Sequence, residues 1–169
     1  SPSPSATPSP SATPVLTSTV TPPPQGETAI LAEYHIASNP AAAIIPATGG
    51  LQNDSRLYNS KNSATMWSSQ SPSLDGWQTN DYWQVEFNTR NFTNIKINAK
   101  QRSSKTGPQN FQVRYSIDGS VFENLTTVTM TDTVTERGPY FLPAACDNQQ
   151  KVTIRWVVLD ASPASAGTS

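Results

Sequence analysis

Few side chains in this sequence have the chemistry that catalysis requires. His35 is the only histidine, and no nucleophile-elbow sequence accompanies it, so a Ser-His-Asp arrangement is not indicated. The sequence has no histidine or cysteine clusters with metal-binding spacing. Two carboxylates distant in sequence can form a glycosidase pair, but most acidic residues here fall in turns or on the solvent face of predicted strands. We therefore expect a protein that is not an enzyme.

Two tryptophans are the strongest candidates for ligand contact. Sugars present flat C–H faces that stack on aromatic rings, and hydroxyls that pair with planar polar side chains. Trp67 and Trp77 each lie in a polar, loop-like stretch, within residues 66–70 and 75–80. An exposed tryptophan in a loop is costly to keep without a ligand, although either ring could instead cap the end of the fold.

Three tyrosines and two cations are secondary candidates. Tyr58, Tyr82 and Tyr140 could each contact a ligand, but Tyr82 would serve equally well as an ordinary surface aromatic. Arg102 and Lys105 share one loop and could hydrogen-bond a sugar. Arg102 has a second interpretation, as a buried arginine that ties down loop carbonyl groups.

Four short runs alternate apolar and polar residues, which is the period-two pattern of half-buried strands. These runs are Tyr82–Phe87, Ile95–Ala99, Phe111–Tyr115 and Val152–Val158. The alternation turns a set of aromatic residues inward, where we expect them to form the core. They are Trp83, Phe87, Phe111, Tyr115, Phe122 and Trp156.

Turn signals separate these runs, among them Asp118-Gly119 and Gly138-Pro139. Residues 28–36 also alternate, and we expect a strand there, although their alanine and glutamate content would also suit one or two helical turns. Several strands spaced by turns, with no helices between them, predict an all-β antiparallel sandwich or barrel.

Two sequence motifs, one after the other along the chain, resemble those of a known fold family. Residues 82–87, YWQVEF, form an aromatic-rich strand with a late acidic residue, and residues 111–122 read F-x-V-x-Y-S-x-D-G-x-x-F. This order resembles the galactose-binding-like, or discoidin-like, jelly-roll sandwiches. With residues 101–108 and 45–50 added, the chain is similar to accessory modules of large secreted Firmicutes proteins. Those proteins include carbohydrate-active enzymes, extracellular nucleases, and surface or biomass-sensor proteins of cellulolytic clostridia.

The resemblance implies a jelly-roll fold over most of residues 29–169, and it says little about the ligand. Jelly-roll modules commonly hold a structural calcium ion between loops, and Asn53 and Asp54 lie in a loop of suitable oxygen-rich chemistry; an ordinary Asx turn is the alternative. In the resembling modules a loop like residues 161–169 leads into a final strand. We expect the sandwich to lack that strand, which would leave an edge for a strand-donating protein partner.

The composition divides the chain into two parts. Residues 1–26 have no charged residue and hold eight of the fifteen prolines, so we expect a disordered Pro/Ser/Thr linker, with the sandwich at residues 27–169. The net charge of −1 disfavours a nucleic-acid partner, and no apolar run approaches the roughly 20 residues needed to cross a bilayer, so we expect no membrane contact. The linker suggests an extracellular or cell-surface location.

Two functions of different classes remain open. The first is polysaccharide binding or sensing by a non-catalytic extracellular module of a larger protein, which the linker, the sandwich and the two loop tryptophans favour. The second is a structural or protein-interaction spacer of a cell-surface assembly, which the missing strand and the lack of a clear aromatic platform favour. A role as a nuclease accessory follows from the resemblance alone. We favour glycan binding.

Overall fold

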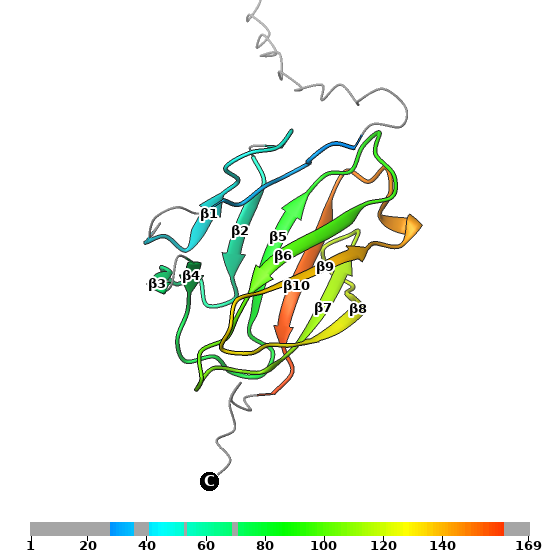
Figure 1. Cartoon of the computed structure of the whole chain (residues 1–169). Coiled ribbons are helices and arrows are strands. Elements are labelled where there is room, and N and C mark those ends of the chain that lie inside the picture. Colours follow the sequence, from blue (N-terminus) through cyan, green and yellow to red (C-terminus); the bar gives the residue numbers. More distant parts are fainter. Residues whose placement is uncertain (1–27, 36–40, 53, 69–70, 161–169) are drawn as a thin grey trace, which may run out of the picture.

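The structure is a computed structural model that describes residues 28–35, 41–52, 54–68 and 71–160 (Figure 1). The predicted linker, residues 1–26, lies outside the described residues. The described part is all-β, with antiparallel strand pairs, one short 3-10 helix (Ala144–Cys146) and no α-helix. The strands are β1 (Ile44–Pro46), β2 (Arg56–Asn59), β3 (Met66–Ser68), β4 (Ser71–Ser73), β5 (Tyr82–Phe87), β6 (Lys96–Gln101), β7 (Asn110–Ser116), β8 (Glu123–Thr129), β9 (Thr135–Phe141) and β10 (Val152–Val158).

One six-stranded sheet carries most of the structure. Its strand order is β1-β2-β5-β10-β7-β8, so β10 lies in the interior with β5 on one side and β7 on the other. The four runs predicted from alternation are all strands: β5, β6, β7 and β10. Their inward residues include Val113, Val152 and Ile154, each with no exposed surface, which confirms the predicted alternation.

A second, two-stranded sheet of β6 and β9 covers the inner face of the large sheet (Figure 1). Ile95 and Leu142, beside β6 and β9, belong to the same buried cluster as Val113, Ile154 and Trp156. Each buried aliphatic side chain contributes about 1.5–3 kcal/mol relative to an exposed one. The described residues therefore form a β-sandwich around a single core. A separate hairpin of β3 and β4 lies beside the β1 end of the large sheet (Figure 1).

The β7–β8 hairpin turns where the sequence predicts. Gly119 has a φ of +78°, which a side chain would disfavour. The Asp118 carboxylate accepts hydrogen bonds from the backbone N–H groups of Ser120 and Val121, at 2.8 and 2.9 Å. The aspartate thus closes the turn that the glycine permits.

The predicted inward position of Phe122 is wrong. Its ring lies over the Arg155 guanidinium, with 3.8 Å between the ring centroid and Cζ, and Arg155 points outward from β10. Because β7 lies between β8 and β10, the ring must reach across β7 at Ser116, whose side chain is small and only 1% exposed. The other predicted core aromatics do lie in or against the core: Phe111, Tyr115 and Trp156 are buried, and Trp83 and Phe87 are partly buried.

Two further predictions about the elements differ from the structure. Gly138-Pro139 is not a turn between strands but lies inside β9, an edge strand that tolerates the missing N–H of proline. A Cβ on Gly138 would meet the Ile97 carbonyl oxygen at 2.5 Å, so only glycine fits at this bulge. Residues 28–35 form no strand; they make one isolated bridge, Glu33 to Gly49, because their hydrogen bonds serve the loop at 48–52 instead.

Candidate binding site

A hollow at one end of the sandwich brings two loops together. It measures about 330 Å³, within the size range of small-ligand sites. One loop precedes β5, and the other joins β6 to β7. The lining residues are Leu74, Asp75, Gly76, Trp77, Ser104, Thr106, Gly107 and Pro108. The lining thus combines an aromatic ring with hydroxyl groups and a carboxylate.

Trp77 is held in place by other aromatic rings. Its ring lies 5.8 Å from that of Trp83 with a tilt of 59°, and 6.3 Å from that of Phe111 in an edge-on arrangement. Such pairs add about 0.5–1.5 kcal/mol beyond the burial of apolar area. Trp77 is half-buried, so it caps this end of the core and also lines the hollow. Both sequence interpretations of Trp77 are therefore compatible with its position.

The second loop is fixed by backbone hydrogen bonds. Ser103 N–H donates to the Thr131 carbonyl, and Gly107 N–H donates to the Ser104 carbonyl. A Cβ on Gly107 would lie 2.5 Å from the Ser103 hydroxyl oxygen, so a side chain there would force this hydroxyl to shift. The closed loop leaves Ser104 and Thr106 exposed at the hollow.

The structure brings together some of the predicted site residues. Trp77 and the loop that carries Arg102 and Lys105 meet at this hollow; Lys105 is exposed between two lining residues, and Arg102 is half-buried. Trp67 pairs through its backbone with Pro72 in the β3–β4 hairpin, and its side chain lies outside the described part. Asp75, Ser104 and Thr106 were not predicted as site residues, because single polar residues in loops have no distinctive pattern.

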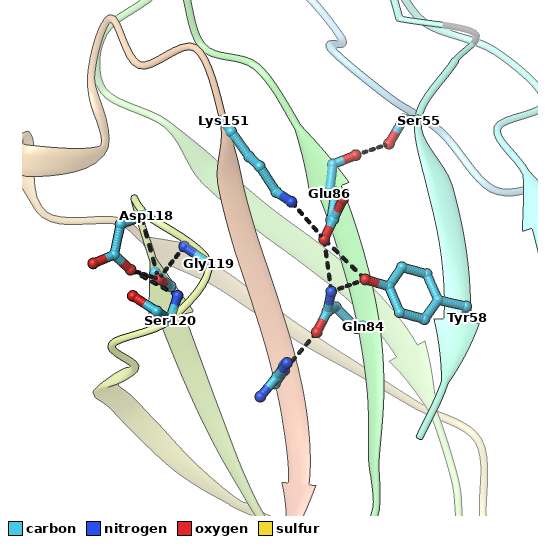
Figure 2. Close-up of polar contacts among 10 residues, drawn as sticks. Ser55, Tyr58, Gln84, Glu86, Asp118, Gly119, Ser120 and Lys151 are labelled. Carbon is cyan, nitrogen blue, oxygen red and sulfur yellow. Dashed lines mark hydrogen bonds and ion pairs between the residues drawn. The ribbon is translucent and has the colours of Figure 1, made fainter. Parts of the chain in front are cut away.

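Tyr58 and Tyr82 lie elsewhere, on the outward face of the six-stranded sheet. There Tyr58 donates to Glu86 Oε1 at 2.8 Å, and Gln84 Nε2 donates both to Glu86 Oε1 and to the Tyr58 hydroxyl (Figure 2). Lys151 Nζ forms an ion pair with the same Glu86 oxygen at 3.0 Å. The third tyrosine, Tyr140, packs against the core from β9.

Electrostatics hold this outward network in one protonation state. Burial raises the pKa of Tyr58, and the hydrogen bond to Glu86 raises it further. Burial opposes ionisation of Glu86, but the hydrogen bonds from Lys151 and Tyr58 outweigh it and keep its pKa below the ordinary value. The network therefore consists of a neutral phenol and a charged carboxylate at neutral pH.

The predicted calcium loop offers few free oxygens. The Gln52 amide is bonded to the backbone of Asn88 through both its nitrogen and its oxygen. Ser55 is bonded to the Glu86 carbonyl and to the Tyr34 hydroxyl. Asn53 lies outside the described residues, which leaves Asp54 as the exposed carboxylate of this loop. Among described residues no group of three or more His, Cys, Asp or Glu side chains is placed to hold a metal ion. A calcium ion in this loop therefore stays a prediction.

A second hollow, of about 530 Å³, lies beside this loop and beside Lys151. Its lining includes Gln52, Ser55 and Glu86, whose polar groups are already engaged by the contacts described above, and Phe87 is its aromatic residue. The exposed Asp54 and Gln150 also line it, and unlike the hollow at Trp77 it has no tryptophan.

Comparisons with known proteins do not place the chain in a family. No family model, no curated protein and no solved structure matches it. Within the described ranges, no helix has the length and apolar character of a membrane span.

Proposed function

We propose that this chain is a non-catalytic carbohydrate-binding module of an extracellular or cell-surface protein, built as a galactose-binding-like jelly-roll sandwich behind a Pro/Ser/Thr linker. The observation that carries the proposal is the hollow at Trp77, where a tryptophan held by two other rings faces hydroxyl groups and a carboxylate. An aromatic ring for C–H stacking beside oxygen groups for hydroxyls is the arrangement that sugars require.

The acidic side chains support a role without catalysis. Asp81 is paired with Lys61, Glu86 with Lys151, and Asp118 with its own turn. Each of these carboxylates therefore has a structural task. His35 is exposed, and its backbone N–H donates to the Thr48 hydroxyl.

A second function, as a structural or protein-interaction spacer, is favoured by a different observation. Trp77 packs on Trp83 and Phe111, as a residue that only closes the core would do. The outer strands β1 and β8 each pair on one side within the large sheet, and a free strand edge can pair with a strand of another protein.

The test is retention of the whole chain by polysaccharides. Native gels would contain soluble glucan, xylan or pectin, and pull-downs would use insoluble cellulose and chitin. Trp77→Ala should weaken binding roughly tenfold or more, because a stacked ring is the main apolar contact of such a site. Since Trp77 supports the core, Asp75→Asn with Thr106→Val supplies a variant that changes exposed lining groups alone.

Asp54→Asn is the matched control, because it removes an exposed carboxylate that does not line this hollow. Retention that is lost in the Asp75 and Thr106 variant but kept in the Asp54 variant supports the proposal. No retention on any polymer would instead favour the spacer function.

A further inference from the structure

The outward face of the six-stranded sheet carries two arginines side by side. Arg155 on β10 and Arg114 on β7 are direct partners in the antiparallel register. Side chains in such pairs have Cβ atoms about 4.5–5.5 Å apart, and like charges there destabilise a sheet. A compensating negative charge is therefore expected nearby.

Neutral groups, and not carboxylates, orient both arginines. Arg155 Nε donates to Gln84 Oε1 at 2.5 Å, and Arg114 Nε donates to Gln112 Oε1 at 2.8 Å. The Arg155 guanidinium also lies between two aromatic rings, 4.0 Å from the Tyr82 centroid and 3.8 Å from that of Phe122. These contacts fix the position of each guanidinium without cancelling its charge.

The neighbouring carboxylates are engaged elsewhere. Glu86 is paired with Lys151, and Glu123 accepts a hydrogen bond from Tyr115 at 2.5 Å. Asp118 accepts from its own turn. Neither Arg114 nor Arg155 makes an ion pair with any Asp or Glu in the described part of the chain, and their terminal nitrogens donate to none of its residues.

We propose that Arg114 and Arg155 bind the oxyanion groups of an acidic polysaccharide, as uronate carboxylates or sulfate esters. A guanidinium whose Nε is already bonded presents its terminal nitrogens as a rigid donor pair, which suits an oxyanion better than a flexible lysine does. Binding would also remove the cost of two adjacent positive charges.

A sugar chain is favoured over an acidic peptide by the surrounding side chains. In the strand register, Gln112 and Thr127 are paired and so are Arg114 and Asn124, which surrounds the arginines with amide and hydroxyl groups. Such groups match the hydroxyls of a sugar. This site is separate from the hollow at Trp77, and the inference does not require that hollow to bind sugar.

The test measures affinity for defined polymers by titration calorimetry with the whole chain. The probes are polygalacturonate, dextran sulfate, neutral dextran and poly-glutamate, at about 0.15 M salt, where exposed charges are screened beyond roughly 8 Å. Arg114→Gln and Arg155→Gln should each weaken binding to polygalacturonate or dextran sulfate roughly tenfold or more. Arg90→Gln, at an exposed turn residue, is the control with the same charge change.

Each variant is checked for folding by its melting curve. If Arg155→Gln fails to fold, Arg155→Lys replaces it, because lysine keeps the charge but loses the planar donor pair. The preferred polyanion then identifies the source of the oxyanion. The proposal is overturned if neither acidic polysaccharide binds, if Arg90→Gln weakens binding as much as the other variants, or if poly-glutamate binds as tightly through the same arginines.

Discussion

Replacing Phe122 tests whether its ring belongs to the outward face of the sheet. A core phenylalanine costs about 3–5 kcal/mol when it is truncated to alanine. On the outward face, Phe122→Leu keeps much of the apolar surface and removes mainly the contact with the Arg155 guanidinium, 3.8 Å away. Cation–π contacts contribute about 0.5–1 kcal/mol when exposed and about 2 when desolvated. For this half-buried ring we expect Phe122→Leu to lower the free energy of unfolding by about 1 kcal/mol.

A double-mutant cycle separates this contact from ordinary packing. Phe122→Leu is compared in the wild-type background and in an Arg155→Met background, where the cation is absent but a long apolar side chain remains. The coupling free energy should be about 1 kcal/mol. Urea unfolding followed by tryptophan fluorescence would show it as a midpoint difference of about 0.5 M, for a slope near 2 kcal/mol per M.

Two results would refute this reasoning. The first is an equal cost of Phe122→Leu in both backgrounds, which would mean that the ring does not depend on Arg155. The second is a cost near that of a core truncation, which would return Phe122 to the interior. Val121→Ala, at the neighbouring residue with 65% exposure, should change stability by no more than about 0.5 kcal/mol.

Two other predictions concern buried and hydrogen-bonded groups. The Thr153 hydroxyl is buried and has no hydrogen-bond partner among the described residues. Thr153→Val should therefore raise the free energy of unfolding by about 1 kcal/mol in urea melts. A loss of stability greater than that of the exposed control Thr127→Val would contradict this. Backbone hydrogen bonds from Ser120 and Val121 hold the pKa of the Asp118 carboxyl well below its ordinary value. Stability from this group is therefore present above the unfolded pKa of about 3.9 and is lost as the pH falls through the folded pKa. NMR titration should find Asp118 still ionised where an unfolded aspartate is mostly protonated, and titration in the ordinary range would count against the turn geometry.

The alternation of apolar and polar residues was sufficient to predict the long strands from the sequence. The inward residues of β5, β7 and β10 lie in or against the core, so their residue types are constrained at every second position. The Asp118-Gly119 turn was equally predictable, because its geometry depends on local residues alone. Short strands such as β1 and β4, with three residues each, are too brief to show a period.

The predictions that were wrong depended on tertiary contacts. Gly138-Pro139 is a turn signal by local propensity, but pairing with β6 keeps it inside β9. Tyr115 pairs with Glu123, so Phe122, one residue earlier, alternates to the opposite, outward face, and this pairing is set by the length of the turn.

The candidate site was only partly accessible from the sequence. Trp77 and the loop with Lys105 could be identified because an aromatic or charged residue in a polar loop is distinctive. The pairing of Arg114 with Arg155 could not be identified from the sequence, because it depends on the register of two strands far apart in the chain. A charge pair of this kind becomes visible only when the strand order is known.

The interior position of β10 has a consequence for how the protein is made. β10 is the last strand described along the chain, yet it separates β5 from β7 and pairs with both. During synthesis the β7–β8 hairpin can form from local contacts, but β5 and β7 cannot join one sheet until residues 152–158 have left the ribosome. Such long-range pairing is slow and leaves strand edges open to other nascent chains. Insertion of β10 is therefore the step that commits the polypeptide to its native sheet.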